Sequence, residues 1–66
     1  MNVNLLRSKM ALKGHRDKDL AEVLEVTPST LSKKLKNEIA LYREDIQKII
    51  ELYKLTPDEI QEIFFV

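Results

Sequence analysis

The sequence predicts an all-α fold, a compact bundle of about five short helices that forms one domain over residues 1–66. Three observations support this prediction. Apolar residues recur at spacings of three and four, which is the period of an amphipathic helix. The single glycine and the two prolines all lie where a helix would begin or end. No segment shows the alternation of apolar and polar residues that a half-buried strand needs.

Composition limits the classes of protein to which the chain can belong. Because there is no cysteine, disulfides and cysteine-based metal sites are excluded. No apolar run approaches the roughly 20 residues that a membrane-spanning helix needs, and the N-terminus lacks the pattern of a signal peptide. We therefore expect a soluble, cytoplasmic protein that uses no cofactor or metal and has no membrane partner.

The first two predicted helices are short. The first covers roughly residues 5–13, with Asn4 as its N-cap and Gly14 in a left-handed conformation after its end. The second covers roughly residues 17–24. Its expected apolar stripe consists of Leu20, Ala21, Val23 and Leu24.

The last three predicted helices have clearer starting signals. Thr27 can cap a helix over residues 28–36, since its side-chain oxygen can accept from a backbone N–H of the first turn. Pro28 also suits the first helical position. A fourth helix is expected over residues 43–54. The fifth opens with Thr56-Pro57-Asp58-Glu59, which is a capping box with proline at the first helical position. The aromatic residues Tyr42, Tyr53 and Phe64 are expected mostly in the core.

The second and third helices are joined by about three residues, Glu25-Val26-Thr27. A connection this short between two short helices sets them at a steep angle, as in a helix-turn-helix. We therefore predict a helix-turn-helix over about residues 17–36. In that arrangement the second helix enters the major groove of DNA.

Residues 20–33, LAEVLEVTPSTLSK, resemble the helix-turn-helix of the phage Cro and repressor family, which is lambda-repressor-like. The family has a small residue at the position of Ala21, where the two helices approach each other. Its apolar positions match Leu20, Leu24, Val26 and Leu31. The resemblance extends over nearly the whole chain and implies a DNA-binding regulator.

Three residues depart from the family pattern. Glu25 stands where the family has glycine, so a left-handed backbone there would cost about 1 kcal/mol. Lys34 stands where the family has an apolar residue, and we expect Leu35 to supply that packing instead. At the start of the second helix, Arg16 or Asp17 replaces a small polar cap, which makes the usual phosphate contact there doubtful.

The resemblance implies which residues contact DNA. The residues that would read bases are Pro28, Ser29, Ser32 and Lys33. The candidates for phosphate contacts are Arg16, Lys18, Lys36, Asn37 and Arg43.

The charge distribution favours a polyanionic partner on one side. Residues 1–36 hold eight basic and four acidic side chains, a net +4, whereas residues 37–66 hold three basic and seven acidic ones, a net −4.

These patterns predict a sequence-specific transcriptional regulator, a phage Cro-like repressor that binds a palindromic operator in double-stranded DNA. We expect a homodimer on DNA, with Phe65 and Val66 at the dimer interface, because adjacent residues on a helix cannot both face inward. The competing arrangement folds Phe65 back onto Leu5 and Leu6 within one subunit.

Two other functions stay open. An antirepressor or modulator with the same fold would bind a repressor protein instead of DNA, and the zero net charge, Asp17 and Glu25 favour it. The second alternative is a structural helical domain with no nucleic-acid role. An enzyme is not expected, since the only histidine, His15, suits half-buried packing and no catalytic or metal-ligand spacing surrounds it.

Overall fold

The computed structural model describes residues 1–65 of the chain. Over these residues the chain forms five helices and no strand, so the predicted fold class is confirmed. The helices are α1 (Val3–Leu12), α2 (Asp17–Val23), α3 (Pro28–Leu35), α4 (Arg43–Tyr53) and α5 (Pro57–Phe64). No helix among the described residues has the length and apolar character needed to cross a bilayer.

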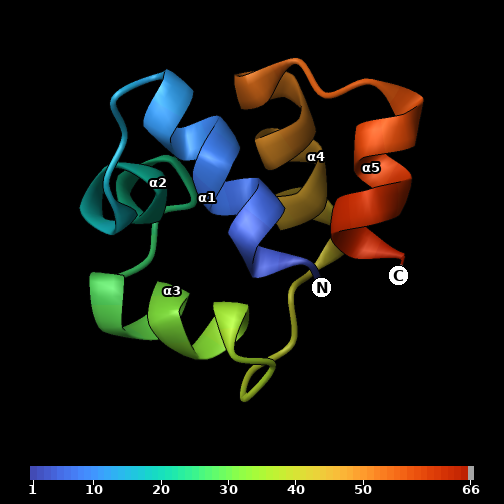
Figure 1. Ribbon diagram of the computed structural model, residues 1–66. Coiled ribbons are helices and arrows are strands. Elements are labelled where there is room, and N and C mark those ends of the chain that lie inside the picture. Colours follow the sequence, from blue (N-terminus) through green and yellow to red (C-terminus); the bar gives the residue numbers. More distant parts are fainter. Residues whose placement is uncertain (66) are drawn as a thin grey trace.

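The five helices surround one core (Figure 1). Helices α2 and α3 pack against each other at one side of the molecule, and α5 packs against α1 at the other. The two ends of the chain lie near each other, since the Asn2 N–H donates a hydrogen bond to the Ile63 carbonyl at 2.7 Å. Every helix contributes to the core, whose buried residues are Leu6, Met10, Leu20, Ala21, Leu24, Leu31, Leu35, Ile49, Tyr53, Leu55 and Ile63.

The helix starts follow the caps expected from sequence, with one correction. Thr27 accepts a hydrogen bond from the Thr30 N–H, and Thr56 accepts one from the Glu59 N–H, so both predicted N-caps are confirmed. The N-cap of α1 is Asn2 and not Asn4, because the Asn2 side chain accepts from the Leu5 N–H at 3.1 Å. Helix α1 therefore starts about two residues earlier than predicted.

A residue in the left-handed region follows the end of each of the first four helices. These residues are Gly14, Glu25, Asn37 and Lys54, with φ angles of 69°, 59°, 62° and 49°. Sequence reasoning identified the first two positions and missed the last two. Because a left-handed residue reverses the chain within one turn, this backbone conformation allows short connections between steeply inclined helices.

Two side chains lie outside the core where the sequence pattern placed them inside. Val23 is 37% exposed, because α2 ends at this residue and its inward face is already filled by Leu20, Ala21 and Leu24. Tyr42 is 64% exposed, because it precedes α4 as its N-cap residue and does not belong to the inward face of that helix.

The connection between α2 and α3 has the geometry that a helix-turn-helix requires. The Val26 N–H donates to the Ala21 carbonyl at 2.9 Å, and the Glu25 N–H donates to the Glu22 carbonyl at 3.1 Å. These two bonds form a Schellman motif with Glu25 as its left-handed residue. Ala21 is fully buried beneath this turn, where α2 and α3 pack together.

We predict that Ala21→Leu destabilises the protein by about 1–3 kcal/mol, because three added carbons have no free volume between α2 and α3. Chemical denaturation followed by circular dichroism measures this change. Val23→Leu is the matched control on the same helix, since Val23 is partly exposed, and it should change stability by less than about 0.5 kcal/mol. An unchanged denaturation midpoint for Ala21→Leu would show that the helices do not meet closely at this residue.

Candidate nucleic-acid interface

The outer face of α3 is a polar surface that begins at a well-ordered helix start. The Thr27 side chain caps the helix, and its hydroxyl also donates to the Thr30 hydroxyl at 3.0 Å, so these two threonines are used locally. Pro28, Ser29 and Lys33 are exposed, whereas Ser32 is partly buried. Three of the four side chains predicted to read bases are therefore open to a partner, and the fourth is partly so.

The segment after α3 holds three of the predicted phosphate contacts. Lys36, Asn37 and Arg43 are all exposed, with Lys36 at the end of α3 and Arg43 at the start of α4. The left-handed backbone of Asn37 turns the chain, and the Glu38 N–H then donates to the Lys33 carbonyl at 2.9 Å. This turn keeps Asn37 next to the end of the helix that carries the base-reading candidates.

The start of α2 holds the other two predicted phosphate contacts, Arg16 and Lys18, both exposed. The Arg16 N–H donates to the Asp19 carboxylate at 2.8 Å, which satisfies this end of the helix without a small polar cap. Asp17 is bound by Arg7 of α1 at 2.7 Å. Acidic groups near the predicted DNA surface are thus occupied by partners within the protein.

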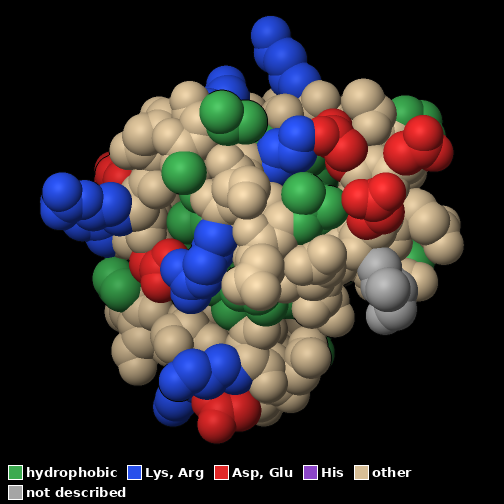
Figure 2. Space-filling view, viewed as in Figure 1, with side chains coloured by type: hydrophobic (Ala, Val, Ile, Leu, Met, Phe, Trp, Pro, Cys, Tyr) green, Lys and Arg blue, Asp and Glu red, His purple; other side chains and the backbone are tan. Residues whose placement is uncertain are grey.

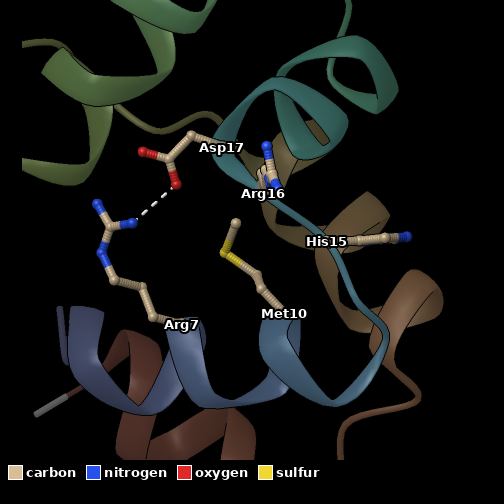
Figure 3. Close-up of a pocket in the computed structure, with 5 residues that line it drawn as sticks. All are labelled: Arg7, Met10, His15, Arg16 and Asp17. Carbon is tan, nitrogen blue, oxygen red and sulfur yellow. Dashed lines mark hydrogen bonds and ion pairs between the residues drawn. The ribbon is translucent and has the colours of Figure 1, made fainter.

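A shallow pocket lies beside this ion pair (Figure 3). Arg7 reaches from α1 toward Asp17 in the close-up, while His15 points away from the pair. Met10 and Arg16 complete the lining. Among residues 1–65, no three histidine or carboxylate side chains gather as a metal site.

His15 has the half-buried packing role that the sequence suggested. Its Nδ1 lies 3.0 Å from the Tyr53 hydroxyl, and the two rings meet edge to face with their centroids 5.6 Å apart. Burial, together with the negative charge of Asp19, raises the pKa of Tyr53 to about 12. Tyr53 is therefore neutral at physiological pH, and the contact joins the segment before α2 to the end of α4.

An ion pair inside the protein was not foreseen from sequence. Lys34 is only 4% exposed, and its Nζ lies 3.1 Å from the Asp45 carboxylate and 3.0 Å from the Ala40 carbonyl. We expected Leu35 to take the place of position 34 in the core. Leu35 is buried, but Lys34 is buried too, so both residues pack inward. The available signal was that Lys34 lies three residues after buried Leu31, on the inward face of α3.

Charge is divided between the two sides of the molecule. Helix α3 carries two lysines and is followed by a third, Lys36, and it has no acidic residue, whereas α5 carries Asp58, Glu59 and Glu62 and no basic residue. Figure 2 shows carboxylates gathered at the upper right, over α5 and the loop before it. Lys and Arg side chains lie at the left and lower edges, over α2 and the end of α3, and others lie at the top and near the centre of this view. A polyanion would meet favourable potential on the α3 side.

One of the two predicted dimer residues lies beyond the end of α5, away from α3. Phe65 follows α5, on the opposite side of the molecule from α2 in Figure 1, and is 63% exposed. This exposure leaves most of the side chain open to a second copy, and the choice between a dimer contact and packing onto Leu5 and Leu6 stays a prediction. Val66, the other predicted interface residue, lies outside the described residues.

The arrangement of α2, the Schellman turn and α3 within five helices agrees with a known family. Residues 5–65 match the Cro/C1-type HTH DNA-binding domain. The chain belongs to this family. This match confirms the resemblance found from residues 20–33. The matched span covers all five helices of this chain except the first two residues of α1. Comparisons with curated proteins and with solved structures gave no match.

Membership in this family makes the chain a DNA-binding regulator whose partner is double-stranded DNA. Helices α2 and α3, which are joined by the turn at Glu25, lie within the predicted residues 17–36. The exposed outer face of α3 is the part of this unit that is available to enter a groove.

Proposed function

We propose that this protein is a sequence-specific repressor of the phage Cro type, and that α3 reads the major groove of its operator. The observation that carries this proposal is the outer face of α3 in a Cro/C1-type domain. It is exposed, free of acidic residues and anchored on the core by its inner face. Pro28, Ser29, Ser32 and Lys33 would contact base edges, the first through apolar contact only and the others by hydrogen bonds.

Phosphate contacts would fix α3 in the groove. The candidates belong to two exposed groups: Arg16 and Lys18 at the start of α2, and Lys36, Asn37 and Arg43 around the end of α3. Such contacts add affinity and salt dependence without reading sequence. Bound at a promoter, such a repressor would act by steric exclusion of RNA polymerase.

The operator would be palindromic and bound by two copies. The supporting observation is Phe65, a large apolar side chain left 63% exposed beyond α5. A two-fold contact between copies would bury it and would place two reading helices about one helical turn of DNA apart. In this proposal the whole chain, residues 1–66, is one DNA-binding domain, and Val66 takes part in the same contact.

An antirepressor that binds a repressor protein is the second candidate. The acidic residues near α2 and the zero net charge favour it. However, Asp17 is held by Arg7, and Asp19 caps the start of α2, so neither carboxylate is free to repel a phosphate at full strength. This pairing favours DNA as the partner of this surface.

Selection of duplexes from a random DNA pool by the purified protein tests the proposed function. A repressor of this type should enrich a palindrome whose half-sites are about 10 base pairs apart, with binding that weakens steeply as salt is raised. An antirepressor would enrich no sequence and would bind random duplex hardly at all.

We predict that Lys33→Ala weakens binding to the selected duplex by about 1–3 kcal/mol and relaxes preference at one base pair of each half-site. Lys33 can donate to guanine O6 and N7 from the outer face of α3. Titration of selected and random duplexes measures the effect. Lys13→Ala is the matched control, because Lys13 is an exposed lysine at the end of α1. An equal loss of affinity for the selected and the random duplex would show that Lys33 contacts phosphate and does not read a base.

We predict that Phe65→Ser weakens the dimer without unfolding the subunit, because burial of a Phe side chain contributes about 1.5–3 kcal/mol. Sedimentation equilibrium should show wild-type dimers on a two-site duplex and a shift toward single copies for the variant. Leu12→Ser is the control, since Leu12 is 81% exposed at the other end of the fold. Equal masses for wild type and Phe65→Ser, with lowered thermal stability of the variant, would reject the dimer role.

A further inference from the structure

Three lysines lie near the end of α3, and one of them differs from the other two. Lys33 and Lys36 are exposed, but the side chain of Lys34 turns inward and is 4% exposed. Its ammonium group cannot reach a phosphate on the outside of the protein. Lys34 therefore belongs to the helix that is proposed to bind DNA, but its side chain has a role inside the protein.

The ammonium group of Lys34 holds together three consecutive parts of the chain. From α3, it donates to the Ala40 carbonyl in the following loop at 3.0 Å and to Asp45 of α4 at 3.1 Å. It also lies over the ring of Tyr42, 4.7 Å from the ring centroid. Each contact is made to a residue beyond the left-handed turn at Asn37.

Asp45 completes this cluster. The same carboxylate oxygen that accepts from Lys34 also accepts from the Tyr42 N–H at 3.1 Å and so caps the start of α4. Asp45 is 8% exposed, which shields the pair from competing water and salt. Among the described residues, no buried side-chain nitrogen or oxygen lacks a partner. The cluster is therefore a fully satisfied polar network between α3 and α4.

We propose that Lys34 is a positioning residue, whose buried ion pair with Asp45 fixes residues 36–43 relative to α3 so that phosphate and base contacts form in one register. The inference rests on the proposed reading role of α3. An apolar residue at position 34 would fill the same volume, but it could not hold the Ala40 carbonyl. A buried ion pair of this kind contributes little net stability compared with apolar packing, and its better-supported use is to specify one arrangement.

Fixing this loop before binding matters because Lys36, Asn37 and Arg43 lie on it or at its ends. If the loop were disordered in the free protein, its ordering would oppose binding to DNA. A misplaced loop would still attract phosphates, since its charges remain. Specific binding should therefore depend on Lys34 more than random binding does, although Lys34 itself touches no DNA.

The test uses the double variant Lys34→Met/Asp45→Asn, in which the asparagine oxygen can still cap α4 and no buried charge is left alone. Its affinity is measured for the duplex that the wild type selects and for a random duplex, across a range of salt concentrations. We expect its preference for the selected duplex to fall about tenfold. The slope of binding against salt should stay unchanged. Lys36→Ala is the control, and it should lower that slope by about one phosphate contact.

Two results with the double variant would overturn the proposal. A salt slope reduced as in Lys36→Ala would show that Lys34 contacts phosphate directly. A folded variant with wild-type preference would show that the pair does not position the loop. If the wild type selects no duplex at all, the proposed function fails instead, which separates the two outcomes.

Hydrogen exchange of the wild-type protein gives a second arm that needs no variant. The Glu38 amide donates to the Lys33 carbonyl of α3 and the Tyr42 amide donates to Asp45 of α4, so both should exchange slowly before DNA is added. Exchange at the rate of an unfolded chain, slowed only when the selected duplex is present, would show that DNA and not Lys34 orders the loop.

Discussion

The close packing of α2 against α3 is the constraint on which the rest of the structure depends. It requires a side chain no larger than a methyl group at Ala21, and a chain reversal within about three residues. The reversal is made by a Schellman turn whose left-handed residue is Glu25, a position where glycine would be less strained. With the inner face of α3 held in this way, Pro28, Ser29 and Lys33 on its outer face are exposed and available to DNA.

Some charged side chains of this protein form ion pairs within the fold, and others remain exposed and available to a partner molecule. Lys34 and Asp45 neutralise each other in the core, and Arg7 occupies Asp17 at the start of α2. Exposed basic groups lie at the start of α2 and around the end of α3, whereas α5 is acidic. Net charge therefore says little about the partner of this domain, because the unequal distribution of the charges creates the field that a polyanion meets.

Sequence reasoning identified the five helices and the helix-turn-helix, because caps and apolar spacing are local signals. It misplaced the first N-cap, since the choice between Asn2 and Asn4 depends on a backbone bond from Asn2 to Ile63, far away in the chain. The spacing of Lys34 to Leu31 indicated an inward position, but the partners of Lys34 could not be predicted, because they depend on where the loop brings Ala40 and Asp45. The exposure of Pro28, Ser29 and Lys33 agrees with their proposed role in reading bases.

The central claim is that α3 and its flanking loop form the DNA-contacting surface. Amide chemical shifts of the labelled protein, followed while the duplex selected by the wild type is added, test this claim most directly. The account predicts that the largest changes fall on residues 28–37, with further changes at residues 16–18 and at Arg43. Large changes elsewhere while the amides of α3 keep their positions would contradict it.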